Sequence, residues 1–182
     1  MNSMIILITG TPGVGKTTVS SLLAERLDAC LIDINQLVEE KHLYTSIDEV
    51  RKYKIVDLDA LFDEMNRIVG EINNNFTIIE GHLSHLFENS DIVIVLRANP
   101  DVLKRRMETK GWEKSKIREN IEAEAIDLCS YEAHEIHGDK VNEIDTSSIA
   151  PEEVVDLIID VINGDKKFPA GSVDFLEYLN DF

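Results

Sequence analysis

The chain has 182 residues, 43% of them hydrophobic, so one compact domain with a substantial core is expected. Its 35 acidic and 18 basic residues give a formal net charge of -17, which disfavours direct, sequence-specific binding of nucleic acid. No apolar run reaches the roughly 18 residues of a membrane span. The apolar stretch at residues 4–8 lacks the basic leader and cleavage site of a signal peptide. We therefore expect a cytoplasmic protein without a membrane anchor.

Short apolar segments alternate with amphipathic ones along the chain. The strands that this pattern predicts cover residues 4–9, 29–32, 76–79, 91–96 and 141–144. The predicted helices cover residues 17–27, 36–41, 57–73, 99–109, 115–137 and 151–162. Alternating strands and helices predict a parallel sheet with helices on both faces, which is an α/β fold with a five-stranded sheet.

Two segments do not follow this alternation. Residues 34–56 are mixed and polar, and only short helical pieces are predicted there. The tail, residues 165–182, has apolar residues at helical spacing. We expect a short helix docked on the domain, with a dimer contact or a partner contact as the alternatives.

The segment Gly10-Thr-Pro-Gly-Val-Gly-Lys16-Thr17 matches the phosphate-loop pattern G-x-x-x-x-G-K-[ST] at every fixed position. A predicted strand precedes it and a predicted helix follows it, which is the context that makes the pattern specific. Gly13 and Gly15 leave room for phosphate oxygens, and the backbone N–H groups at the helix start bind anions. Lys16 is expected to contact the outer phosphates and Thr17 to bind Mg²⁺, with Thr18 contacting an inner phosphate. The sequence thus predicts a P-loop NTPase of three-layer architecture that binds ATP and Mg²⁺.

Polar residues follow two other predicted strands, at the edge where parallel sheets bind ligands. Asp33 and Asn35 follow the second strand and are candidates for binding a second substrate; the alternative for Asp33 is a helix N-cap. Glu80 and His82 follow the third. A carboxylate at this position can order Mg²⁺ or orient an attacking oxygen, and the histidine can position a phosphate or a water molecule. A structural histidine is the alternative for His82.

Basic residues gather near the end of the helix predicted at 99–109. Arg106 and Lys110 are four residues apart and share one side of that helix. They are candidates for neutralising charge during phosphoryl transfer, with Arg106 as a catalytic residue. The alternative is a solvated helix end.

These motifs together resemble the adenylate kinase isoenzyme 6 family, the atypical short-lid adenylate kinases and NTPases of archaea and eukaryotes. The resemblance rests on GTPGVGKTT at 10–18, Glu80-Gly81-His82, R-M-E-T-K-G-W-x-x-x-K at 106–116 and E-N-I-x-A-E at 119–124. The set covers most of residues 4–162. The chain departs from the eukaryotic members in having Lys110 for Arg, Trp112 for Tyr and Glu80 for Asp.

The resemblance implies an enzyme that converts ATP and AMP into two ADP, with some ATPase activity. It implies nucleotide contacts at Lys110 and at the phosphate-loop residues Gly13, Gly15, Lys16, Thr17 and Thr18. It also implies a nucleoside monophosphate kinase-like domain over 1–164, with an AMP site near 30–53 and a short lid near 109–119. Arg51 is the candidate clamp for the AMP phosphate. Family members also act in small ribosomal subunit maturation by binding a basic ribosomal protein, a partner that an acidic chain suits.

Two other functions are open at this point. The chain can be an ATPase switch that remodels its ribosomal partner, with Glu80 and His82 positioning water. It can also be a small-metabolite kinase, in which Asp33 binds a substrate hydroxyl.

Overall fold

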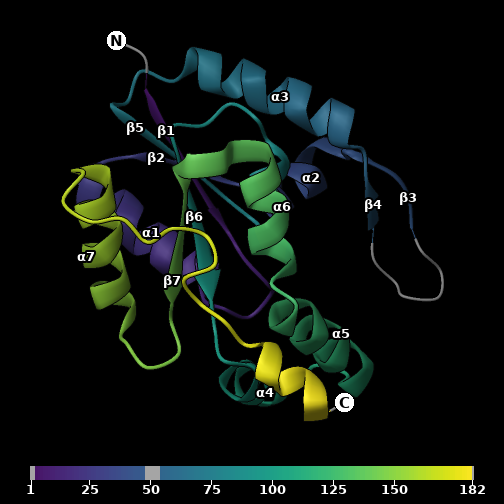
Figure 1. The fold of residues 1–182 in the computed structure, drawn as a ribbon. Coiled ribbons are helices and arrows are strands. Elements are labelled where there is room, and N and C mark those ends of the chain that lie inside the picture. Colours follow the sequence, from purple (N-terminus) through teal and green to yellow (C-terminus); the bar gives the residue numbers. More distant parts are fainter. Residues whose placement is uncertain (1–2, 48–53, 182) are drawn as a thin grey trace.

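The computed structural model describes residues 3–47 and 54–181 and contains the predicted parallel sheet (Figure 1). The strands are β1 (Met4–Thr9), β2 (Cys30–Asp33), β5 (Phe76–Glu80), β6 (Ile92–Arg97) and β7 (Val141–Asp145). They pair in the order β2-β5-β1-β6-β7, and every pair is parallel. The α/β P-loop fold with a five-stranded parallel sheet is therefore confirmed.

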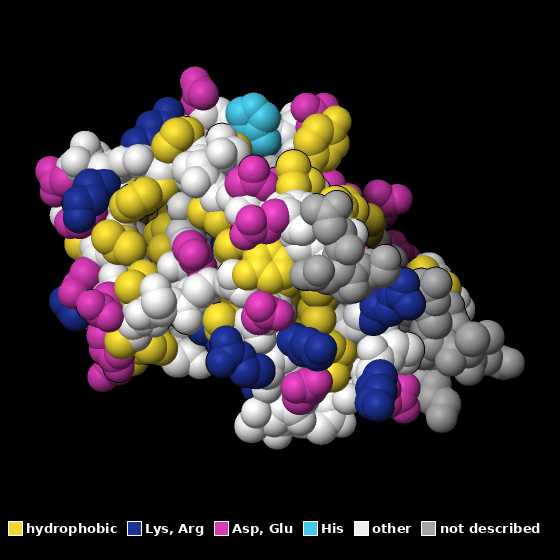
Figure 2. All heavy atoms as spheres, turned by 60° about the horizontal axis from the view of Figure 1, so that its bottom comes forward, with side chains coloured by type: hydrophobic (Ala, Val, Ile, Leu, Met, Phe, Trp, Pro, Cys, Tyr) yellow, Lys and Arg dark blue, Asp and Glu magenta, His cyan; other side chains and the backbone are white. Residues whose placement is uncertain are grey.

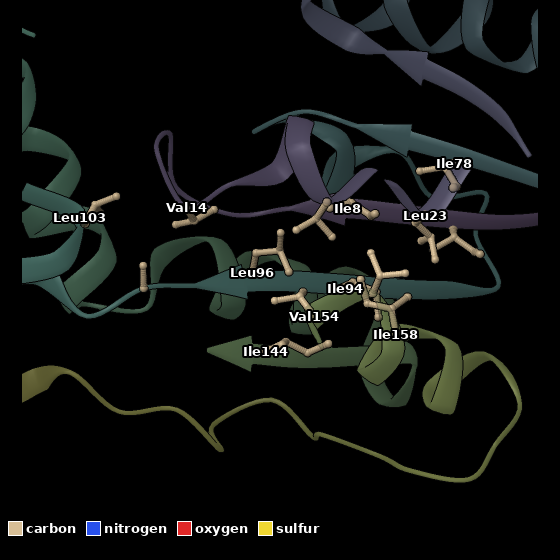
Figure 3. Close-up of a cluster of buried hydrophobic side chains, with 14 of the residues drawn as sticks. Ile8, Val14, Leu23, Ile78, Ile94, Leu96, Leu103, Ile144, Val154 and Ile158 are labelled. Carbon is tan, nitrogen blue, oxygen red and sulfur yellow. The ribbon is translucent and has the colours of Figure 1, made fainter. Parts of the chain in front are cut away.

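Alternate residues of each strand face opposite sides of the sheet, and each side has its own apolar core. In β1, Ile6 and Ile8 belong to one core, whereas Ile5 and Leu7 belong to the other. Figure 3 shows the first core, in which Ile8 and Ile94 meet Leu23, Val154 and Ile158 from helices. The central strands are buried on both faces, which explains their continuous apolar sequences.

Helices cover both faces of the sheet (Figure 1). The first core is formed with α1 (Lys16–Leu27), α4 (Pro100–Thr109), α5 (Lys114–Ala125) and α7 (Pro151–Ile162). The second is formed with α2 (Ile34–Lys41), α3 (Leu58–Glu71) and α6 (Leu128–His137). Short 3-10 helices lie at Ser84–Leu86, Gly138–Lys140 and Leu176–Asp181. No helix among the described residues has the length and apolar character needed to cross a membrane.

The segment after β2 contains a small hairpin that the sequence did not predict. After α2, strands β3 (Tyr44–Ile47) and β4 (Lys54–Val56) pair antiparallel. Each is only three or four residues long, and its side chains are half-buried or exposed, so the apolar alternation that identifies a strand is weak here. The predicted clamp Arg51 lies outside the described residues.

The prediction of one helix over residues 115–137 is wrong, because α5 and α6 are separate helices. The break lies at Asp127, whose φ of 57° is in the left-handed region. Aspartate tolerates this conformation better than most residues, but unlike glycine or proline it does not indicate in the sequence that a helix ends. The conformation is supported by the contact that it allows, since the Asp127 carboxylate accepts a hydrogen bond from Arg97.

Arg97 is the centre of a buried ionic network at the end of β6. Its side chain is 1% exposed, and its guanidinium pairs with Glu124, Asp127 and Glu143. Glu124 and Glu143 are each only 2% exposed. The network joins the end of β6 to the α5–α6 junction and to β7, so one side chain fixes three elements.

The C-terminal tail runs back along β7 before its final 3-10 helix (Figure 1). The N–H of Glu143 donates to the carbonyl of Phe168, and the N–H of Phe168 donates to the Asn142 side chain. Further along, the N–H of Val173 donates to Glu143 at 2.9 Å, and the Phe175 ring lies over Arg97. The tail is thus attached to the same ionic network.

Replacing Arg97 with methionine should destabilise the protein severely. The substitution leaves buried carboxylates without a cation, and removing one partner of such a group costs about 3–5 kcal/mol. Chemical denaturation followed by circular dichroism measures this loss. The control is Arg118→Met, since Arg118 is exposed and forms a surface ion pair with Glu122 one helical turn away. Equal stability of the two variants would contradict the structural role of the network.

Candidate active site

The parallel register brings the predicted site residues to one edge of the sheet. Ile8 of β1 lies opposite Glu80 of β5, and Asp33 of β2 lies opposite the same Glu80. The phosphate loop leaves β1 just beyond this point. Figure 2 looks onto this end of the molecule, where Lys and Arg side chains lie among dispersed Asp and Glu side chains. Positively charged side chains are therefore present on this face of the molecule despite its negative net charge.

The phosphate loop has the backbone that its glycines predict. Gly10 has a φ of 133°, and a Cβ there would lie 2.3 Å from the carbonyl oxygen of Leu96. Gly15 has a φ of 111° and is the N-cap residue of α1. A side chain at Gly10 would collide with backbone, and both conformations are strained for other residues. The loop therefore turns tightly from β1 into α1 and leaves the first N–H groups of α1 available to an anion.

Lys16 lies folded back against its own loop. Its ammonium donates hydrogen bonds to the carbonyls of Gly10 at 2.7 Å and Thr11 at 3.2 Å. Burial lowers the pKa of Lys16 from 10.5 to about 8, although nearby Glu80 and Glu124 oppose the change. The lysine remains mostly charged at neutral pH and lies at the start of the helix where a phosphate would sit.

Thr17 and Glu80 are directly joined. The Thr17 hydroxyl donates to Glu80 Oε1 at 2.9 Å, so the first turn of α1 meets the end of β5. Burial raises the pKa of Glu80, and the neighbouring Asp33 raises it further. These oxygens suit Mg²⁺, which prefers hard oxygen ligands and keeps several waters. Among the described residues, no group of three or more His, Cys, Asp or Glu is placed to hold a metal ion, so Mg²⁺ at this position would depend on oxygens of Thr17, Glu80, the nucleotide and water.

His82 stands just beyond Glu80, where the sequence placed it. Partial removal from water lowers the pKa of His82 to about 4, and the positive charge of Lys16 contributes to the shift. The ring is therefore neutral at pH 7 and can either donate or accept a hydrogen bond.

The phosphate loop lines a pocket of about 260 Å³ that brings most predicted nucleotide contacts together. From the loop and α1 come Gly13, Gly15, Lys16, Thr17 and Thr18, and Asn35, Glu80 and His82 complete one side. Lys110 and Trp112 close it from the connection between α4 and α5. Residues far apart in sequence thus surround the space where the loop would hold phosphates.

A second pocket of about 820 Å³ adjoins the first. It lies between α2, β4 and the segment after β5, and its lining is largely apolar, including Ile34, Val38, Val56, Leu58 and Leu83. Asn35 and His82 line both pockets. The size and the mixture of apolar and polar lining are typical of a site for an organic ligand.

Two predicted site residues make other contacts in the structure. The Asp33 carboxylate accepts from the N–H groups of Asn35 and Gln36, so it is the N-cap of α2, the alternative weighed above. Arg106 donates to the carbonyls of Val14 and Thr146 and holds the outside of the phosphate loop. A direct contact of either residue with a substrate stays a prediction.

Sequence reasoning missed the role of Glu124. The Thr11 hydroxyl of the phosphate loop donates to this carboxylate, which also pairs with Arg97. Glu124 closes the motif at 119–124, but a glutamate on a predicted amphipathic helix reads as a solvated residue. Only its 2% exposure reveals that it is part of the site's support.

Comparisons with known proteins identify the family of this chain. The family described as "AAA domain" matches residues 6–127. A protein of Methanothermobacter thermautotrophicus is 43% identical over 175 residues, covering 96% of this chain and 99% of the relative. A protein of Methanocaldococcus jannaschii is 42% identical over 181 residues, covering 98% of this chain and 97% of the relative. Both carry the name "Putative adenylate kinase".

Solved structures with the same fold are more distant in sequence. Shikimate kinase from Acinetobacter baumannii superposes with a TM-score of 0.64 at 17% identity, covering 90% of this chain and 95% of that one. Thymidylate kinase from Candida albicans superposes with a TM-score of 0.60 at 16% sequence identity, covering 90% of this chain and 92% of that one. These two establish the fold alone. At more than 40% identity over nearly the whole length of both chains, the archaeal relatives establish more: the chain belongs to their adenylate kinase family, a family of nucleoside monophosphate kinases.

Proposed function

We propose that the protein transfers the terminal phosphate of ATP to AMP and forms two molecules of ADP. The observation that carries this proposal is the pair of adjoining pockets that share Asn35 and His82. One is built around phosphate-binding groups, and the other has room and apolar surface for a nucleoside. A phosphate bound in each would meet at the shared wall, which is the arrangement that direct phosphoryl transfer needs.

Catalysis here would consist of positioning and charge neutralisation. The loop N–H groups and Lys16 would hold the outer phosphates of ATP, and Lys110 would add a positive charge from the lid side. Thr17 and Glu80 fit Mg²⁺, which when bound with ATP neutralises charge on the β- and γ-phosphates. Neutral His82, on the wall between the pockets, would orient the attacking oxygen. Arg106 would keep the loop in place through Val14.

We further propose that the chain belongs to the isoenzyme 6 branch of the family. Support comes from the placement of its motifs: Glu80-Gly81-His82 lies beside the phosphate loop, and Lys110 and Trp112 of the second motif close the same pocket. The short connection around Lys110 would then be the lid, the α2–β4 region the AMP-binding insert, and the tail an addition to the core domain. In an open pocket, water can replace AMP, which gives the accompanying ATPase activity.

The small-metabolite kinase is the less favoured alternative. Its central residue would be Asp33, but one oxygen of that carboxylate already accepts two backbone hydrogen bonds as a helix cap. The likeness to shikimate kinase concerns the fold alone.

Purified protein should form ADP from ATP and Mg²⁺ in an AMP-dependent reaction. Lys16→Ala should lower kcat/KM at least about 100-fold, because it removes a charge aimed at the transferred phosphate. A coupled assay with AMP, other monophosphates, shikimate and no acceptor, run side by side, measures both effects. ATP consumption at the same rate with and without AMP would rule out the kinase and favour the ATPase.

Filling the larger pocket should block AMP selectively. Leu58 lines that pocket and is 37% exposed, so tryptophan at this position can enter the cavity without disturbing the core. We expect Leu58→Trp to raise the KM for AMP about tenfold, as loss of pocket volume displaces the nucleoside. The ATP dissociation constant, measured by calorimetry, should not change.

The matched control is Leu31→Trp. Leu31 is also 37% exposed but lies on β2, outside the lining of this pocket. An unchanged KM for AMP in Leu58→Trp, or the same rise in both variants, would place the acceptor elsewhere.

A second proposed function is binding of a basic ribosomal protein of the small subunit. The formal charge of -17 favours a basic partner by long-range attraction. The same site would then act as an ATP-dependent switch during ribosome maturation.

Immobilised protein should recover a basic small-subunit ribosomal protein from extract of the source cells, identified by mass spectrometry. ATP should change the amount recovered, and Lys16→Ala should remove that ATP effect while keeping the charged surface. Raised salt should weaken the complex, because screening reduces the attraction. Recovery of no such protein, with or without ATP, would exclude this second function.

A further inference from the structure

One side chain of the phosphate loop, that of Thr11, forms a hydrogen bond with α5. Thr11 is 2% exposed, and its hydroxyl donates to Glu124 Oε2 near the C-terminal end of α5. The same residue holds the loop together through its carbonyl, which accepts from the Val14 N–H at 3.3 Å and from Lys16 at 3.2 Å. A shift of Thr11 would therefore move both the turn of the loop and the resting position of Lys16.

Glu124 is itself held rigidly. Its other oxygen, Oε1, accepts from Arg97 Nε at 2.8 Å and from the Ala98 N–H at 3.0 Å. Arg97 also donates to the backbone carbonyl of Glu124 at 3.0 Å. A carboxylate whose two oxygens are both occupied in a buried, charged setting has one permitted orientation.

We propose that Glu124 is a positioning residue for nucleotide binding, because it fixes Thr11 and thereby the phosphate loop. The inference rests on the nucleotide binding proposed above. Glu124 would not touch ATP; it would act through Thr11, whose hydroxyl it holds. The preorganised loop would then bind phosphates without first having to be ordered.

The other side of the same network provides a matched control. Glu143 is as buried as Glu124 and also pairs with Arg97. Its remaining contacts go to Ser130 and to the tail at Val173, away from the phosphate loop. Loss of its charge should therefore affect stability as loss of the Glu124 charge does, but should leave the loop in place.

The fluorescence of Trp112 can be used to measure ATP binding. Trp112 is the only tryptophan in the sequence, and it lines the phosphate pocket. Its fluorescence, titrated with ATP and Mg²⁺ well below the melting temperature of each variant, gives the ATP dissociation constant directly. Melting temperatures of the same samples report stability separately.

We expect Thr11→Val and Glu124→Gln each to raise the dissociation constant of ATP about tenfold, since Thr11→Val removes the charge-assisted hydrogen bond that fixes the loop and Glu124→Gln leaves only a weaker neutral one. The double variant should bind no more weakly than the weaker single variant, because both changes act on one connection. Thr11→Ser, which keeps the hydroxyl, should bind ATP as the wild type does. Glu143→Gln should lower the melting temperature as Glu124→Gln does, with a dissociation constant within about twofold of the wild type.

An unchanged dissociation constant in Thr11→Val, or an equal rise in Glu143→Gln, would overturn the inference and leave Glu124 a structural residue. Additive effects in the double variant would do the same. These outcomes are separate from a failed kinase assay, because ATP binding needs no acceptor. Absence of saturable ATP binding in the wild type would overturn both the proposed function and this inference.

Discussion

The parallel pairing of β1 between β5 and β6 is the constraint on which the rest of the site depends. Because all three strands run in the same direction, their carboxyl ends meet at one edge. That single fact places the phosphate loop beside Glu80 and allows Thr17 to reach the carboxylate. It also places the end of β6 against the loop, where the Leu96 carbonyl leaves no space for a side chain at Gly10.

The net charge of the molecule repels an anionic ligand, whereas the groups that line the pocket attract one. A net charge of -17 repels ATP at a distance, but at physiological salt this field is screened over about 8 Å. The lining of the pocket includes the phosphate loop, Lys16 and Lys110, which place hydrogen-bond donors and positive charge where a phosphate would lie. Lys16 is buried, and burial strengthens its attraction for an anion because fewer waters compete for the same group. An acidic protein can therefore bind an anion tightly and still attract a basic partner to its outer surface.

Much of the fold and of the site could be predicted from the sequence, and the reasons lie in local patterns. The buried strands read as continuous apolar runs, and the loop pattern specified both its glycines and the lysine that follows. Glu80 and His82 were found because they directly follow a buried strand. The β3–β4 hairpin was missed because its strands are too short and exposed to show an alternation. For Asp33 the sequence left two roles open, substrate binding and a helix N-cap, because it cannot show which groups the carboxylate contacts; the structure shows the cap.

The break between α5 and α6 shows why long-range contacts escape this kind of reading. Residues 115–137 have helical periodicity throughout, and Asp127 carries no signal that stops a helix. The contact that accompanies the break comes from 30 positions earlier, where the buried guanidinium of Arg97 donates to the Asp127 carboxylate. With the chain turned at Asp127, the end of α5 offers Glu124 to Arg97 and Thr11, while α6 packs against the other face of the sheet. One straight helix over these residues could not pack against both faces of the sheet. The connection around Lys110 and the contact of Glu124 with the phosphate loop thus lie toward opposite ends of α5, and Arg97, which does not line the pocket of the phosphate loop, holds the C-terminal end of that helix through Glu124.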